Sequence, residues 1–236
     1  MKGVCNKVLK VDLTNGTCNV EEVPDKVYEY FIGGAGIAAY YMWKECRAGT
    51  SAFDPANRLT FASGMINGVK QSGAGKWTAG AISPSINMNA DSAATASFGI
   101  EIKKAGYDAV VVHGRSEKPV YVLIDDDKAE LKDAPNLWDK DAYVAEDSIK
   151  KAEGDNFEVV TIGQAGERLV RFANIQTRKK SFLGRCGLGA VMGSKLLKGV
   201  AVRGTQDREL EPERQLLLIK QVPGHQRQFP FVVGRG

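Results

Sequence analysis

The chain has 236 residues, 43% of them hydrophobic, which is enough to bury one full core. Its 32 basic and 28 acidic residues give a formal net charge of +4 and are interspersed, so no basic arm or stripe predicts a nucleic-acid partner. No run approaches the roughly 20 apolar residues that a membrane-spanning helix needs. The first 13 residues alternate apolar and polar side chains, unlike a secretory signal.

The first elements predicted along the chain are a β-hairpin and two short helices. Lys7–Leu13 and Thr17–Val23 have strand character, and Thr14-Asn15-Gly16 between them supplies the positive φ angles of a tight hairpin turn. Helices are predicted next, over Asp25–Phe31, where Gly33-Gly34 stops the helix, and over Ile37–Glu45, where apolar residues recur at helical spacing.

Strands dominate the rest of the chain. They are predicted over Arg58–Ser63, Lys76–Ile82, Ala109–Gly114, Val120–Asp125, Lys128–Lys132, Glu158–Ile162, Arg171–Ile175 and Gly199–Arg203, and helices over Ala93–Lys104, Ala142–Ala152 and Leu188–Leu197. The run Asp125-Asp126-Asp127 lies between two strands and predicts a hairpin turn. Because strands cluster with few intervening helices, we expect an α+β fold with largely antiparallel sheets.

Cysteine and histidine usage gives no metal site. The four cysteines show no CxxC spacing and no paired pattern, which favours a reducing cytoplasm over a disulfide framework; they are Cys5, Cys18, Cys46 and Cys186. His113 and His225 are too few and too far apart for a histidine metal centre. We therefore expect a cytoplasmic chain with neither nucleic acid nor membrane as its partner.

Two glycine-rich strings match nucleotide-binding patterns without their context. Gly34–Ala39 fits G-x-G-x-x-A, but the preceding segment is predicted to be helical where a buried strand is required. Gly73-Ala74-Gly75-Lys76 is similar to a phosphate loop, yet position 70 is lysine instead of glycine, and Trp77 stands where Ser or Thr binds magnesium. Both strings argue against a nucleotide site.

The stretch Gly184–Lys195 joins a glycine-rich turn to an apolar run that ends in Ser-Lys. Such a turn brings backbone N–H groups within reach of an anion, but it is also typical of a tight turn before a packed helix. Together with Lys104–Tyr121, this stretch resembles the N-terminal domain of the aldehyde:ferredoxin oxidoreductases, enzymes built around tungsten held by two pterin dithiolenes. Further matching strings lie in the family's order, namely Lys10–Gly16, Phe31–Gly36, Asp54–Gly64 and Ile162–Glu167.

The resemblance extends from about Gly3 to Gly204 and implies two stacked β-sheets that form a base for the cofactor. Residues 1–204 are thus predicted to be the pterin-binding domain, and residues 205–236 a divergent tail without family resemblance. The tail is rich in glutamine, lacks a periodic apolar face and is expected to be poorly tied to the core. Family members continue into two mainly helical domains, so the chain is a truncated product, a single-domain paralogue or a reading-frame accident.

The resemblance also implies a bis-pterin cofactor of tungsten or molybdenum whose two phosphates share a magnesium ion. Family members bind that ion through backbone carbonyls at positions matching Ala93 and Phe182, so the loss of the usual asparagine at 93 need not abolish binding. Lys76 stands where arginine is common, which keeps the charge but loses the two-pronged phosphate contact. The other cofactor-binding residues implied are Thr95, Ser181, Gly184 and Arg185.

The activity implied by the family is oxidation of an aldehyde to a carboxylic acid, with electrons passed to ferredoxin. In the family, the missing domains supply the iron-sulfur cluster ligands and the substrate channel. The scattered cysteines here do not provide four thiolates, and Cys186 is expected to be an accommodated small side chain, so no catalytic residue is predicted. The alternative is a truncated, non-catalytic binding or assembly module that needs a partner chain for the cluster. Whether this chain is itself an enzyme stays open.

Overall fold

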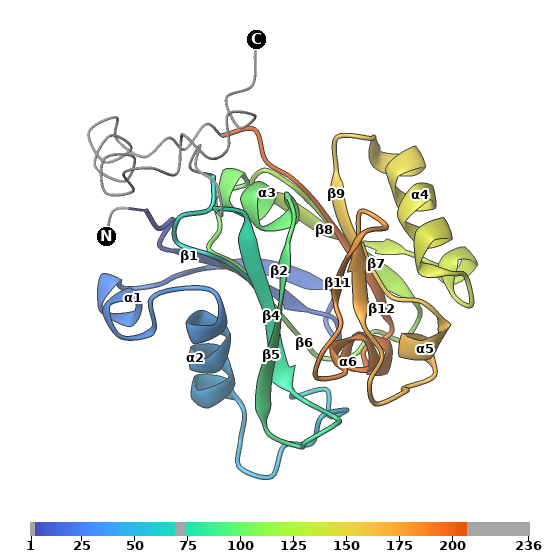
Figure 1. Cartoon of the computed structure of the whole chain (residues 1–236), viewed down its shortest axis with the longest axis horizontal. Coiled ribbons are helices and arrows are strands. Elements are labelled where there is room, and N and C mark those ends of the chain that lie inside the picture. The colour runs from blue at the N-terminus through green and yellow to red at the C-terminus, as the bar shows by residue number, and fades with distance from the viewer. Residues whose placement is uncertain (1–2, 69–73, 207–236) are drawn as a thin grey trace, which may run out of the picture.

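The computed structural model describes residues 3–68 and 74–206. Its strands form two six-stranded sheets, and short helices lie around and between them (Figure 1). The N-terminal sheet contains β1 (Lys7–Asp12), β2 (Thr17–Glu22), β3 (Leu59–Ser63), β4 (Lys76–Ile82), β5 (Asn89–Thr95) and β6 (Ala109–His113). The C-terminal sheet contains β7 (Val120–Asp125), β8 (Lys128–Asp133), β9 (Glu158–Thr161), β10 (Ile175–Thr177), β11 (Ser181–Leu183) and β12 (Leu197–Arg203).

The two sheets have the same topology. The strand order is β2-β1-β6-β3-β4-β5 in one and β8-β7-β12-β9-β10-β11 in the other. Each contains one parallel pair, β1 with β6 and β7 with β12, while the remaining neighbours are antiparallel. The prediction of two stacked, largely antiparallel sheets is confirmed, and the chain repeats one arrangement of six strands twice.

The helices complete a layered structure. They are α1 (Asp25–Phe31), α2 (Ala35–Glu45), α3 (Phe98–Lys104), α4 (Ala142–Glu153), α5 (Gln164–Glu167) and α6 (Leu188–Ser194), with a 3-10 turn, η1 (Pro135–Leu137). Apolar residues of α3 and α6 join both sheets in the central core, for example Phe98 and Met192. Helices α1 and α2 cover the outer face of the N-terminal sheet, and α4 covers that of the C-terminal sheet (Figure 1).

The largest error of the sequence prediction is at β5. We expected a helix over Ala93–Lys104, but the helix begins at Phe98 and Asn89–Thr95 is a strand although alanines favour helices. This strand pairs with β4 along its whole length, and burial alternates along it, with Ser92 buried between exposed neighbours. Pairing within the sheet therefore overrides local helix propensity here.

A second error concerns the segment before α6. Residues 171–174 are turn and coil, the strand begins only at Ile175, and the short strand β11 was not predicted. The two strands are joined by a turn in which Arg178 and Lys179 both have a φ of 54°, a conformation that their residue types do not predict. Helix α6 also ends earlier than expected, at Ser194, because Leu197 already belongs to β12.

The hairpin turns were predicted more reliably. Gly16 (φ 67°) and Asp126 (φ 53°) both adopt left-handed conformations between paired strands, although the first loop spans four residues. At the other end of the domain, the amide of Gly204 donates to Glu101 (3.0 Å) and that of Thr205 to Asp126 (2.7 Å). Gly204 and Thr205 are thus hydrogen-bonded to the domain, whereas the tail from residue 207, to which the prediction of weak attachment mainly refers, lies outside the described residues.

Candidate functional site

The strands β5 and β11 are edge strands of the two sheets, and they lie side by side. At one end of this contact, Ser181 Oγ donates a hydrogen bond to the Thr95 carbonyl (3.4 Å). At the other end, the Arg185 amide donates to Ser92 Oγ (3.3 Å). The two segments therefore run antiparallel, and we call β5 together with residues 181–186 the seam.

The seam brings together the residues that the sequence predicted for cofactor binding. Lys76 pairs with Thr95 across β4 and β5, so it lies at the Ser181 end of the seam. Arg185 lies at the opposite end, beside Ser92. Between the two ends lie Ala93, Phe182 and Gly184. Lys76 and Gly184 thus border the same seam, although Lys76 lies nearer to Ser181 than to Gly184 along it. Gly73, which belongs to the same predicted loop as Lys76, lies outside the described residues.

Ala93 and Phe182 occupy equivalent positions in the two sheets. In each sheet, the pairing partners of one residue can be followed from strand to strand across the whole sheet. We start from the second residue of β1 in the N-terminal sheet and from the second residue of β7 in the C-terminal sheet. The row through Val8 runs Glu21, Val8, Ala109, Ala62, Thr78, Ala93, and the row through Tyr121 runs Lys132, Tyr121, Gly199, Thr161, Gln176, Phe182. The seam is therefore the place where two like edges meet.

The glycine-rich stretch contains glycines of two kinds. A Cβ on Gly187 would lie 1.8 Å from the Arg171 carbonyl oxygen, and one on Gly189 would lie 2.2 Å from that of Asn174. Packing around α6 therefore requires glycine at these two positions. This agrees with the interpretation of the stretch as a tight turn before a packed helix. Gly184 differs, because a Cβ there would have no described atom within 4 Å. Its backbone is open to approach by a ligand.

Comparison with known proteins decides the family. A family model described as "Aldehyde ferredoxin oxidoreductase, N-terminal domain" matches residues 8–204. The chain belongs to this family. The tungsten-containing aldehyde ferredoxin oxidoreductases of Thermococcus kodakarensis and Pyrococcus furiosus are 37% and 35% identical to it over 220 residues. Each of these alignments covers 93% of this chain but 36% of the relative, so the chain spans about a third of their length.

Two further relatives broaden the range of chemistry in the family. The P. furiosus protein named "Aliphatic sulfonate oxidoreductase, WOR-like subunit" is 33% identical over 219 residues, covering 84% of this chain and 34% of that protein. A solved structure, the active site complex BamBC of benzoyl coenzyme A reductase with 1,5-dienoyl-CoA, matches with a TM-score of 0.92 and 34% identity. The match covers 97% of this chain and 35% of that one. The chain is therefore similar to proteins whose names refer to aldehyde, aliphatic sulfonate and benzoyl coenzyme A chemistry.

The seam has features that fit the phosphate end of the family's cofactor. Lys76, Lys180 and Arg185 are exposed cations along it, and Gly184 leaves its backbone accessible. An exposed acid, Asp91, lies at the Arg185 end, where its backbone carbonyl accepts from the Cys186 thiol (3.4 Å). Two like strand edges also suit a ligand built of two like halves.

Cys186 is held in place by hydrogen bonds of its carbonyl and its thiol. It has a φ of 65°, a conformation that favours glycine, and its carbonyl accepts a hydrogen bond from Ser83 Oγ (2.7 Å). Burial raises the pKa of its thiol, and the nearby Asp91 adds to this rise. Within residues 3–68 and 74–206, no three His, Cys, Asp or Glu side chains are grouped to hold a metal ion.

Lys195, which ends the glycine-rich stretch, has a structural role. Its Nζ is buried and donates to the carbonyls of Pro55 (3.0 Å) and Gly114 (3.2 Å). Pro55 precedes β3 and Gly114 follows β6, and both of these strands belong to the N-terminal sheet. Lys195 lies between α6 and β12, a strand of the C-terminal sheet. Its side chain therefore links the parts of the domain that contain the two sheets. Burial lowers the pKa of Lys195 to about 7.

The dinucleotide-like string has a packing explanation. Residues Asp25–Phe31 form helix α1, as predicted, so no buried strand precedes Gly34. A Cβ on Gly36 would lie 1.8 Å from the Phe31 carbonyl oxygen. Glycine at 36 is thus required where α1 and α2 meet.

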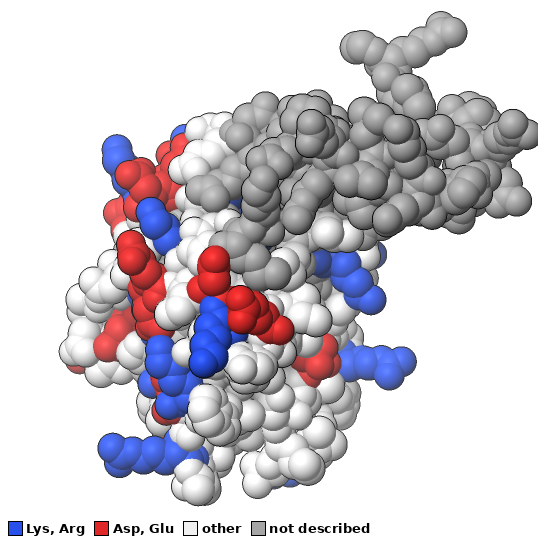
Figure 2. Space-filling model, turned by 90° about the vertical axis from the view of Figure 1, so that its left-hand side faces the viewer, with Lys and Arg blue, Asp and Glu red and all other residues white. Residues whose placement is uncertain are grey.

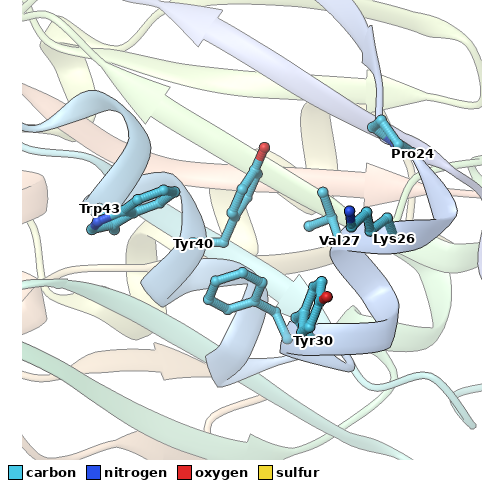
Figure 3. A pocket seen from close by; sticks show the side chains of 7 residues that line it. Pro24, Lys26, Val27, Tyr30, Tyr40 and Trp43 are labelled. Carbon is cyan, nitrogen blue, oxygen red and sulfur yellow. The ribbon is translucent and has the colours of Figure 1, made fainter.

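A hollow that the sequence analysis missed lies between α1 and α2 (Figure 3). It has a volume of about 550 Å³ and is lined by Pro24, Lys26, Val27, Tyr30, Phe31, Tyr40 and Trp43. Tyr30 and Trp43 are each 72% exposed. One feature of the sequence could have indicated the hollow. Trp43 does not lie on the face of α2 that Ile37 and Tyr41 bury against the sheet.

The side of the molecule that carries α1 and α2 shows acidic and basic side chains mixed, with uncharged surface between them (Figure 2). Several of them pair, as Lys44 does with Glu21 (2.7 Å). This face therefore lacks the single-sign charge of a nucleic-acid-binding surface. Among the described residues, no helix has the length and apolar character to cross a membrane.

Proposed function

We propose that this chain is the cofactor-binding domain of a tungsten or molybdenum bis-pterin oxidoreductase that oxidises aldehydes to carboxylic acids, with ferredoxin as electron acceptor. The observation that carries the proposal is the equivalence of Ala93 and Phe182 at the meeting edges of two like sheets. A cofactor with two pterins has two like halves, and an ion shared by its two phosphates would lie between those edges.

Each seam residue has a defined task in this proposal. Lys76 and Arg185 would offset the negative charge of the cofactor's phosphates, and the backbone carbonyls of Ala93 and Phe182 would hold a magnesium ion that neutralises it further. The open backbone at Gly184, together with Thr95 and Ser181, allows close approach and orients the ligand. The cofactor, when bound, supplies the oxygen and electron chemistry. This chain supplies binding, orientation and charge neutralisation.

The rest of the catalytic machinery is assigned to polypeptide beyond this chain. The alignments cover about a third of the relatives' length, and the four cysteines are scattered and form no disulfide within residues 3–68 and 74–206. We therefore assign the iron-sulfur cluster and the aldehyde channel to further domains or to a partner chain, in a cytoplasmic complex. A second candidate, a non-catalytic binding or assembly module, is favoured by the same scatter of cysteines, since a cluster needs four suitably spaced thiolates.

The test is co-expression of this chain with the polypeptide that follows the corresponding domain in the T. kodakarensis relative. We expect the purified complex to contain tungsten and pterin, measured by elemental analysis and by the fluorescence of the oxidised pterin. We also expect the chain alone to show no aldehyde-dependent dye reduction. A complex without pterin would contradict the proposal, and dye reduction by the chain alone would contradict the assignment of the cluster to other polypeptide.

A further inference from the structure

The β10–β11 turn carries three consecutive cations, and two of them are engaged. Arg178 Nη1 donates to Ser97 Oγ (3.1 Å), and its Nε lies 3.9 Å from Glu158. Lys179 pairs with Asp147 (2.6 Å). These contacts anchor the turn to α4 and to the segment before α3. Lys180, in contrast, is exposed and has no side-chain hydrogen bond or ion pair within the described residues.

Lys180 lies at the same end of the seam as Lys76. It precedes Ser181, whose hydroxyl donates to the Thr95 carbonyl, and Thr95 pairs with Lys76. The side chain of Lys76 also has no partner among the described residues and is exposed. Two unpaired cations thus flank the Ser181–Thr95 contact.

No acid offsets these two charges on the seam strands at this end. Asp91, the acidic residue of β5, lies beside Cys186 at the opposite end of the seam, the end that also carries Arg185. Glu158 and Asp147 are already paired with the turn's other cations. Like charges held near each other without a counterion create a positive potential that attracts an anion. The Ser181 end of the seam therefore carries two cations without an acid, whereas the Arg185 end carries one cation and one acid. This difference exists although β5 and β11 are equivalent edge strands.

We propose that Lys180 is a second phosphate-binding cation that acts with Lys76 at the Ser181 end of the seam, so that the two phosphates of the cofactor are held unequally. This inference rests on the proposed function. Lysine binds phosphate as a point charge without the bidentate geometry of arginine, so a second lysine restores attraction that Lys76 alone provides weakly. The phosphate at the Arg185 end, which also carries the acidic residue Asp91, is held less tightly.

The test measures binding of inorganic pyrophosphate, with magnesium present, to the full chain by isothermal titration calorimetry. We expect Lys180→Gln to weaken binding about three- to tenfold, as Lys76→Gln does, because each removes one charge-assisted contact. Lys179→Gln is the matched control, since Lys179 is one residue away but paired with Asp147, and we expect it to change the Kd less than about twofold. Thermal melting of all variants checks that the fold is unchanged.

The same variants are then examined in the co-expressed complex, by pterin content. A Lys180→Gln chain that binds pyrophosphate and retains pterin like Lys179→Gln overturns the inference and leaves the proposed function standing. A native chain that does not bind pyrophosphate also overturns the inference. A native complex without pterin overturns the proposed function and the inference with it.

Discussion

Gly184 and the glycines around α6 belong to one motif, but the space available for a side chain differs between them. Gly187 and Gly189 leave no room for a Cβ, because carbonyl oxygens of the preceding segment lie within 2.2 Å of where it would be. Gly184 has open space around it. The difference teaches that one end of the motif builds the fold, whereas the other end is free to serve a ligand.

The largest expected effect is from Gly189→Ala. The added Cβ would meet the backbone oxygen of Asn174, so α6 or residues 171–174 must move, and we expect a loss of about 3 kcal/mol or more in the free energy of unfolding. Urea denaturation measures it. Gly184→Ala is the matched control and should change stability by less than about 0.5 kcal/mol. Similar losses for both variants would remove the distinction between the packed and the open end.

A second prediction tests the buried end of the motif through its pH dependence. The pKa of Lys195 is lowered from 10.5 to about 7 in the fold, so between these values the unfolded chain binds the proton more tightly. Stability contributed by this group therefore rises with pH from about 7 towards 10.5, by at most about 1.4 kcal/mol per pH unit. The measurement is the difference in unfolding free energy between the native chain and Lys195→Met at several pH values. A difference that does not change with pH, or that falls, contradicts the account.

The smallest effect is expected at the aromatic hollow. Trp43 is 72% exposed, so Trp43→Ser should change the free energy of unfolding by less than about 0.5 kcal/mol. Trp77, fully buried between the sheets, is the contrasting position, and Trp77→Ala should cost about 3 to 5 kcal/mol. Urea denaturation followed by far-ultraviolet circular dichroism compares them. Equal losses would mean that Trp43 is buried in solution.

The sequence predicted the regular parts of the fold better than the seam. Residues 25–31 were predicted as a helix and residues 76–82 as a strand, and both elements have the predicted bounds. Both seam strands were missed as strands. β5 carries alanines and small polar residues, whose propensities favour other structures, and β11 has only three residues.

The site residues came from the family resemblance, because nothing in composition or periodicity indicates a pterin. Pairing partners reveal what the sequence cannot, namely that Ala93 and Phe182 end equivalent rows. The unpaired state of Lys180 also needs coordinates, since its neighbours in sequence are equally basic and differ only in the acids that pair with them. The hollow between α1 and α2 depends on the angle at which two short helices meet, and the position of the aromatic residues in the sequence does not give that angle.

The central claim is that the open end of the glycine-rich motif, on the seam, holds the cofactor. The most direct measurement is the pterin content of the co-expressed complex for Gly184→Val and Arg185→Glu, with Lys128→Glu on the β7–β8 hairpin as the control. We predict that both seam variants fold but retain less pterin than the native chain, whereas Lys128→Glu retains a native amount. Native pterin content in both seam variants would contradict the claim and leave Gly184 as an ordinary turn residue.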